Sequence, residues 1–395
     1  MQFDTLRTQR VGVLMSGGLS CTALGAWLAA NGVETVSYVA DIGQTSPFAP
    51  EELAGLLQAH GMQAKVVDLR STMADMCTSL VKYQATYEGG YWNTTGASRA
   101  VLVGGLAPML REDSCTVLAH GCVGGGNDQA RFARYAATHC PDLAVFTPWT
   151  QPWMLVHFPD RQAMAGYLTA QGFPAGFTRY TTYSVDGNLG GYSHESDELE
   201  SLNTPSQAVQ PVMTCLPQKA PDTVETFQVR FSAGLPMEVN GRAVTPLEAV
   251  QQANERGGRH GISIRSLVEN RVNGTKCRGV YEAPGLEILG QCLAALYQVS
   301  MDKPATHLFR TLSEELGRAV YEGRFLGAAA RAARVAADVL AADASGIVEV
   351  GLYKGNFLIN GLIPTDGAAS TLRQTRFTHG GHHWQTEPYG HPVPL

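Results

Sequence analysis

The sequence predicts an α/β protein that opens with a doubly wound parallel sheet. Short apolar segments alternate with helical stretches over residues 1–168, which is the pattern of repeated strand–helix–strand units. Glycine-rich or polar turns follow three of the apolar segments, at Ser16–Gly18, Asp41–Gln44 and Gly121–Asp128. Because ligands of such sheets bind beyond the carboxyl ends of the strands, we expect these turns to lie at one site.

The elements of this first domain follow in chain order. Apolar segments rich in Val, Ala and Leu predict strands at Val11–Met15, Val36–Ala40, Ala64–Leu69, Thr116–His120 and Ala144–Thr147. The segments between and after them predict helices near Leu19–Asn31, Glu51–His60, Ser71–Tyr87, Arg99–Glu112, Asn127–Thr138 and Asp160–Gln171.

The rest of the chain predicts a smaller α+β domain at 169–362 and a C-terminal arm at 363–395. Alternating apolar residues indicate antiparallel strands joined at Asn240-Gly241, a common hairpin turn. The expected strands are Glu225–Phe231 and Met237–Val239. The expected helices are Pro246–Gly257, Glu287–Val299, Pro304–Glu322 and Leu326–Ala342, and a closing hairpin is expected at Ile347–Asn360. The arm, with His379, His382 and His383 among glycines, is typical of a flexible tail or an oligomer contact rather than of a metal site.

Composition excludes several classes of protein. The 29 basic and 35 acidic residues give a net charge of −6, which argues against nucleic acid as the main partner. No apolar run approaches the ~18–20 residues needed to cross a bilayer, so no membrane partner is expected. The N-terminus also lacks the apolar core of a signal peptide. The 8 cysteines form no CxxC pair, which favours a reduced, cytoplasmic protein.

The turn Ser16-Gly17-Gly18 joins an apolar strand to a helix-forming stretch. Backbone N–H groups at such a helix start are unpaired, and the helix dipole adds partial positive charge there. The turn therefore suits a phosphate chain, although paired glycines also occur in ordinary turns. It lacks the Gly-Lys-Ser/Thr ending of P-loop kinases and is similar to the PP-loop of enzymes that split ATP into AMP and pyrophosphate.

Two further segments combine glycines with charges. In His120–Phe132, consecutive glycines allow a ligand to lie against the backbone, and Asn127, Asp128 and Arg131 follow at a predicted helix start. Arg131 could hold a carboxylate with two parallel hydrogen bonds. In Leu267–Glu282, charges of both signs surround two glycines, which indicates either a polar pocket for a zwitterion or a solvated loop.

Together these segments resemble argininosuccinate synthases. The resemblance covers roughly residues 11–360 and rests on blocks in family order: VLMSGGLSCT, YVADIGQ, YEGGYWNTTGASRA, HGCVGGGNDQARF, SVDGNLGGYSHE, FSAGLPMEVNG and VENRVNGTKCRGVYEAPG. It implies a PP-loop ATP-pyrophosphatase domain, a synthetase domain and an arm used in homotetramers. Family members use ATP with Mg²⁺ to adenylate the ureido oxygen of citrulline, and the amine of aspartate then displaces AMP.

The resemblance also implies roles for individual residues. The positions that correspond to the ATP site are Leu14, Met15, Ser16, Gly17, Gly18, Leu19, Ser20, Cys21, Thr22, Ala40, Arg99 and Gly121. Those that correspond to the citrulline site are Tyr91, Arg131, Ser184, Ser193, Glu269 and Tyr281, and Thr95 also matches a substrate-binding position. Asn127 lies between the two amino-acid substrates and Asp128 faces aspartate, so these two and Arg131 are expected to act in catalysis.

Four departures from the family pattern leave the substrates open. Ser20 replaces an Asp of the PP-loop, Gly96 a Ser that touches citrulline, and Val123 and Gly125 a Thr and a Lys on the aspartate side. One lost hydrogen bond to a charged group costs about 1.5–3 kcal/mol. The chain is therefore predicted to ligate citrulline and aspartate, or another ureido or amide compound and another amine. The alternative is a catalytically silent paralog that binds nucleotide or amino acid in a regulatory or scaffolding role.

Overall fold

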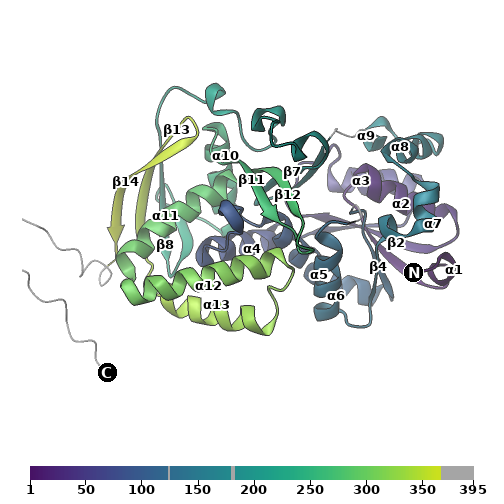
Figure 1. Ribbon diagram of the computed structural model, residues 1–395, viewed down its shortest axis with the longest axis horizontal. Helices are drawn as coiled ribbons and strands as arrows, with labels where there is room; N and C mark the ends of the chain where they lie inside the picture. The colour runs from purple at the N-terminus through teal and green to yellow at the C-terminus, as the bar shows by residue number, and fades with distance from the viewer. Residues whose placement is uncertain (123–124, 179–182, 366–395) are drawn as a thin grey trace, which may run out of the picture.

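The N-terminal part of the protein is built on a parallel sheet. The structure, a computed structural model, describes residues 1–122, 125–178 and 183–365 (Figure 1). The first sheet has 5 strands in the order β3-β2-β1-β4-β5, all parallel. Its strands are β1 (Arg10–Leu14), β2 (Glu34–Asp41), β3 (Ala64–Asp68), β4 (Val117–Ala119) and β5 (Ala144–Phe146).

Helices cover both faces of this sheet, so the doubly wound fold predicted from the sequence is confirmed. One face packs against α2 (Leu19–Ala30), α3 (Pro50–Ala59) and α8 (Arg161–Ala170). The other packs against α4 (Arg70–Tyr83), α5 (Thr94–Glu112) and α6 (Asp128–His139). Short helical segments complete this part: α1 (Phe3–Leu6), η1 (Glu88–Gly90), η2 (Pro148–Thr150), α7 (Pro152–His157) and α9 (Ala175–Thr178).

Two antiparallel sheets form the second part. The first, in the order β10-β9-β8-β13-β14, contains β8 (Glu225–Ser232), β9 (Leu235–Val239), β10 (Arg242–Ala243), β13 (Gly346–Tyr353) and β14 (Asn356–Pro364). The second, in the order β11-β12-β7-β6, contains β6 (Ser184–Asn188), β7 (Gly191–Glu195), β11 (Ile264–Asn270) and β12 (Lys276–Glu282). Three short segments lie on the connection from β7 to β8: η3 (Asp197–Glu200), η4 (Ser206–Ala208) and η5 (Pro217–Lys219).

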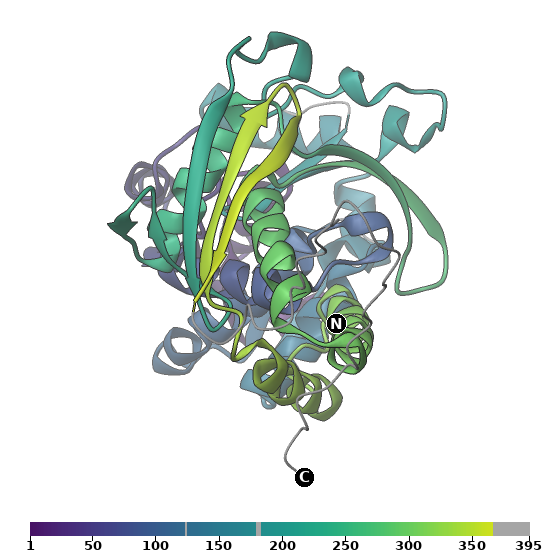
Figure 2. The same ribbon diagram turned by 90° about the vertical axis from the view of Figure 1, so that its left-hand side faces the viewer.

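The two parts share one hydrophobic core. The remaining helices are α10 (Pro246–Arg259), α11 (Pro284–Ser300), α12 (Lys303–Tyr321) and α13 (Ala328–Ala341). One cluster of buried side chains runs from the parallel sheet through α4 and α5 into α10 and α11 and on to β8 and β13. Figure 2 shows α11 lying against β13 and β14. Helices α4 and α5 therefore join the parallel sheet to the second part of the molecule.

Three local predictions differ from the structure. The helix expected at Ser71–Tyr87 ends at Tyr83, because Gln84 takes a left-handed conformation with φ 49°. The helix expected from Arg99 begins earlier, at Thr94. The charged segment Leu267–Glu282 is a hairpin of β11 and β12 rather than a loop. Its strand alternation is hidden in the sequence because charged and apolar residues occur on both faces.

Some predictions concern residues that the structure does not describe. Val123 and most of the expected C-terminal arm, residues 366–395, lie outside the described residues. Among the residues that the structure describes, no helix has the length and apolarity required to span a bilayer.

Candidate active site

The predicted phosphate turn connects β1 to α2. Gly17 has φ 76°, a conformation that glycine adopts readily, and Gly18 is the N-cap of α2. The hydroxyl of Thr22 and the thiol of Cys21 donate back to the Gly18 carbonyl at 2.9 and 3.2 Å. No side chain caps this helix. The amides of the first helical turn, residues 19–21, therefore have no intrahelical acceptor, an arrangement that suits an anion.

The glycine-rich loop after β4 touches this turn directly. A Cβ placed on Gly121 would lie 2.7 Å from the Cys21 nitrogen and 2.8 Å from its Cα. The Gly121 carbonyl accepts a hydrogen bond from Trp149 Nε1 at 3.0 Å. Because β1 and β4 are neighbours at the point where the strand order reverses, both loops lie at the edge where such sheets bind ligands.

A cavity of about 330 Å³ opens beside the turn. Ser16, Val39, Asp41, Gln44 and Leu53 are among its lining residues. Leu14, Met15, Leu19 and Ala40 are buried behind this surface, whereas Ser16 and Gly18 are exposed and Ser20 is half-buried. Most of the residues expected at the ATP site thus lie on one turn, the strand beside it and the neighbouring Gly121, whereas Arg99 lies on α5 and pairs with Asp128 and Asp186.

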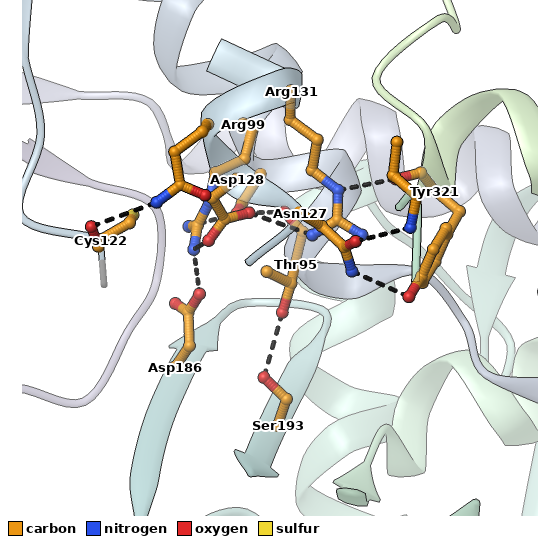
Figure 3. Close-up of polar contacts among 12 residues, drawn as sticks. Thr95, Arg99, Cys122, Asn127, Asp128, Arg131, Asp186, Ser193 and Tyr321 are labelled. Atoms are coloured by element: carbon orange, nitrogen blue, oxygen red, sulfur yellow. Dashed lines mark hydrogen bonds and ion pairs between the residues drawn. The ribbon is translucent and has the colours of Figure 1, made fainter. Parts of the chain in front are cut away.

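Charged side chains of α5, α6 and β6 form one cluster (Figure 3). Arg99 of α5 donates to Asp128 Oδ2 at 2.9 Å, and Arg131 donates to Asp128 Oδ1 at 3.0 Å. Arg99 also donates to Asp186 of β6. Burial opposes ionisation of Asp128, but the two guanidinium groups outweigh it and hold its pKa well below the usual range. Asp128 is therefore a fixed negative charge.

Asn127 connects α6 to the second part of the protein. Its Nδ2 donates to the Tyr321 hydroxyl at 2.8 Å, and its Oδ1 accepts from the Val272 nitrogen at 2.9 Å. Val272 belongs to the turn between β11 and β12, and Tyr321 ends α12. The side chain is thus oriented by two elements far from it in sequence.

The remaining predicted citrulline residues lie on one face of the sheet β11-β12-β7-β6 or against it. Register places Tyr281 opposite Ser193, and Ser184 opposite Glu195. Directly paired residues of antiparallel strands point to the same face. From α5, Thr95 Oγ1 lies 3.1 Å from Ser193 Oγ. The Tyr91 ring lies 4.3 Å from that of Tyr281, measured between centroids.

Glu269 and Arg131 supply opposite charges at this face. Both side chains are 3% exposed. Glu269 Oε1 accepts from the Tyr321 hydroxyl at 2.7 Å, whereas Oε2 is buried and has no hydrogen-bond partner among the residues that the structure describes. Arg131 Nε donates to the Tyr321 carbonyl at 2.6 Å. A buried carboxylate and a buried guanidinium held by one residue suit the two charged groups of a free amino acid.

Three residues at this site were not predicted. Asp186 pairs with Arg99, and Glu195 lies 3.5 Å from the Tyr281 hydroxyl. Burial and then the neighbouring carboxylates raise the pKa of Glu195 to about 7. Both residues stand two positions from a predicted serine, so strand alternation along SVDGNLGGYSHE could have indicated them. Nothing in the sequence near Tyr321 marks it.

The departures from the family pattern differ in their surroundings. A Cβ on Gly96 would lie 2.8 Å from the Val320 carbonyl oxygen, so a larger residue does not fit this packing. Gly125 has φ 80° and open space around it, and Ser20 is half-buried in the first turn of α2. Thus Gly96 is a packing requirement of this chain, whereas Gly125 suits the left-handed backbone conformation at its position and not a lack of space.

Comparison with known proteins agrees with this geometry. Residues 10–169 match the model of the arginosuccinate synthase N-terminal HUP domain, and residues 183–366 match that of the C-terminal domain. The argininosuccinate synthase of Idiomarina loihiensis is 35% identical over 355 residues, covering 88% of this chain and 86% of the relative. That of Vibrio vulnificus is 36% identical over 357 residues, covering 89% and 86%. The chain therefore belongs to the argininosuccinate synthase family, whose members are ligases that form carbon–nitrogen bonds.

Proposed function

We propose that this protein is an ATP-dependent ligase that adenylates the ureido oxygen of citrulline, or of a related ureido or amide compound. An amine, aspartate or a substitute, then displaces AMP. The observation that carries the proposal is the pair of buried opposite charges, Arg131 and Glu269, which are both held by Tyr321. Arg131 would bind the α-carboxylate of the ureido substrate and Glu269 its α-ammonium group.

The remaining groups support the same chemistry. The free amides of residues 19–21 would hold the phosphates of ATP, and the cavity beside Ser16 would take the nucleoside. Ser193 and Thr95 would contact the ureido substrate, while Asn127 and Asp128 would lie toward the amine. Such a reaction needs no protein nucleophile, because catalysis consists of holding two substrates in line and neutralising the leaving pyrophosphate.

Magnesium is expected to enter with ATP rather than on a protein site. Among the described residues, no group of three or more His, Cys, Asp or Glu side chains is placed to hold a metal ion. Ser20, at the position of the family Asp, supplies no carboxylate at the phosphate turn. The side chains near the turn therefore do not form a metal site, and we assign no step to one.

Pyrophosphate release tests the proposal. The purified protein is supplied with ATP and Mg²⁺, and with citrulline or other ureido compounds against aspartate or other amines. Release that requires one ureido compound and one amine together, with AMP in equal amount, supports the ligase. Turnover with another amine but none with aspartate would retain the ligase and exclude argininosuccinate as the product.

Ser20 favours one other candidate function, a paralog that binds nucleotide or amino acid without turnover. The loss of a carboxylate at the phosphate turn could stop the chemistry while leaving the amides in place. Calorimetry with a non-hydrolysable ATP analogue separates the two. Binding of the analogue, with no AMP formed from ATP and any substrate pair, would favour the silent paralog. Ser20→Asp should then restore AMP formation if only this carboxylate is missing.

We also propose that the protein is a cytoplasmic homotetramer with domains at 1–168 and 169–362 and an arm at 363–395. All 8 cysteines are free thiols, which supports a reducing compartment. Light scattering on the full chain and on a chain ending at residue 365 would test the oligomer. An unchanged tetramer after truncation would exclude a role for the arm.

A further inference from the structure

We propose that Tyr321 is a positioning residue of the active site, which holds Asn127, Arg131 and Glu269 in the arrangement that binds the ureido substrate. Tyr321 lies at the end of α12, more than 50 residues away from Glu269 and far from the blocks that identify the family. The identity of the substrate in this inference rests on the proposed function. The arrangement of Tyr321 with Asn127, Arg131 and Glu269 does not depend on the proposed function.

The hydroxyl, the carbonyl oxygen and the aromatic ring of Tyr321 each contact a residue of the site. Its hydroxyl accepts from Asn127 Nδ2 at 2.8 Å and donates to Glu269 Oε1 at 2.7 Å. Its carbonyl accepts from Arg131 Nε at 2.6 Å, and the Arg131 guanidinium lies over its ring, 4.8 Å from the centroid (Figure 3). Because the hydroxyl donates once and accepts once within the protein, its role is to orient these side chains and not to bind substrate.

Close packing fixes the position of Tyr321. The Tyr87 ring stacks on it with centroids 3.8 Å apart. On the α5 side, a Cβ at Gly96 would lie 2.8 Å from the carbonyl oxygen of Val320. On the α6 side, a Cβ at Gly323 would lie 2.8 Å from the Arg131 Cα. Glycines on both sides thus allow the end of α12 to approach α5 and α6 closely.

The hydroxyl also favours the charged form of Glu269. Burial raises the pKa of this carboxyl, and the Tyr321 hydrogen bond is the largest opposing effect, ahead of Arg131. The other titratable groups that face Glu269 are Tyr281 and Cys277 on β12, Glu195 on β7, and Tyr87, Glu88 and Tyr91 before α5. Removal of the hydroxyl should therefore raise the pKa of Glu269 further and weaken its binding of an ammonium group near neutral pH.

Tyr321→Phe tests the inference, because it keeps the ring and removes only the hydroxyl. Tyr297→Phe is the matched control, since its buried hydroxyl donates to the Lys82 carbonyl at 2.6 Å away from the site. We expect KM for the ureido substrate to rise at least tenfold in Tyr321→Phe, and the acid limb of its kcat/KM profile to move to higher pH. KM for ATP should stay within twofold, and Tyr297→Phe should change none of these quantities.

A second variant tests the packing. Gly96→Ala should displace Val320 and Tyr321 and raise the same KM, whereas Gly166→Ala, whose Cβ would meet nothing within 4 Å, should not. An unchanged ureido KM and pH profile in Tyr321→Phe would overturn the inference. So would an equal rise of the KM values for ATP and the ureido substrate, because that result indicates general loss of structure.

A crystal structure of Tyr321→Phe separates this inference from the proposed function, because it needs neither turnover nor substrate. The inference predicts that the side chain of Asn127 or Glu269 changes its rotamer once the bridging hydroxyl is absent. Unchanged positions of Asn127, Arg131 and Glu269 would overturn it, even if the protein proves to be an active ligase. If the protein proves inactive, altered positions would still support it.

Discussion

The two ends of the candidate site are formed by different chemical groups, main-chain amides at one end and side chains at the other. At the phosphate end, the consecutive residues 19–21 provide main-chain amides, and the nearby Thr22 and Cys21 side chains turn back to the Gly18 carbonyl. At the amino-acid end, side chains from α5, α6, β6, β7, β11, β12 and α12 meet, and most of them are buried. The phosphate end should therefore respond to changes of backbone shape, and the amino-acid end to loss of single side chains.

This difference has an electrostatic reason. A triphosphate is bound well by many weak N–H donors at a helix start, and it tolerates exposure to water. A zwitterion must be distinguished from other amino acids, so opposite charges are placed in a dry environment, where each needs protein partners in the absence of ligand. Asp128 and the Tyr321 carbonyl are those partners for Arg131, and the Tyr321 hydroxyl is the partner of Glu269.

Arg131→Ala should have the largest effect. The substitution removes two parallel hydrogen bonds to the substrate carboxylate, worth about 3 kcal/mol or more, so KM for the ureido substrate should rise at least a hundredfold. Steady-state kinetics with ATP saturating measures this change. Arg318→Ala, which removes a half-exposed surface ion pair of α12, should leave KM unchanged. An unchanged ureido KM in Arg131→Ala would remove the proposed carboxylate site.

Gly121→Ala should act at the phosphate end without removing any side chain there. The added Cβ would lie 2.7 Å from the Cys21 nitrogen, so the turn must shift. We expect KM for ATP to rise roughly tenfold to a hundredfold, or about 1.4–2.8 kcal/mol, while binding of the ureido compound alone changes little. Gly55→Ala on α3, with open space around its Cβ, is the control. Calorimetry with an ATP analogue and with citrulline measures both effects.

The same difference explains how far the sequence could be interpreted. The phosphate end could be predicted because strand, glycine turn and helix are contiguous, and each has a local signal. Asn127, Asp128, Arg131 and the charged segment 267–282 were indicated by their own pattern, but the other residues of the amino-acid end could be named only through the family resemblance. Their meeting depends on the β6–β7 and β11–β12 hairpins, and neither hairpin was predicted as a pair of strands.

The residues that were not predicted show what limits prediction of the site from the sequence. Asp186 and Glu195 lie on strands where charged residues occupy the face toward the site, so the usual alternation of apolar and polar residues is masked. Tyr321 follows an amphipathic helix at a position that also suits ordinary core packing, and it is 1% exposed. Its role depends on hydrogen bonds to residues 127, 131 and 269, which no local pattern contains.

Glu195→Gln should change the pH dependence of stability. Glu195 has a pKa of about 7 in the folded protein against its ordinary 4.5, so between these values the folded state keeps a proton that the unfolded state has released. The stability that Glu195 contributes therefore falls as pH rises from about 5 to 7, by about 1–3 kcal/mol. Denaturant unfolding should show the wild type losing stability relative to Glu195→Gln over this range. Parallel curves would contradict the raised pKa.

Cys21→Thr should have the smallest effect. It gives the sharpest test of whether main-chain amides, rather than side chains, determine nucleotide binding at the phosphate end. The thiol donates to the Gly18 carbonyl at 3.2 Å and lies 3.2 Å from Ser16 Oγ, and a threonine hydroxyl can form equivalent bonds. KM for ATP should therefore change less than threefold, because the amides of residues 19–21 keep their positions. A tenfold change would show that a side chain, and not the backbone, determines nucleotide binding, and the contrast between the two ends would fail. Ser193→Ala gives the value for comparison, measured as KM for the ureido substrate. The loss of this hydroxyl at the amino-acid end should raise that KM about threefold to tenfold.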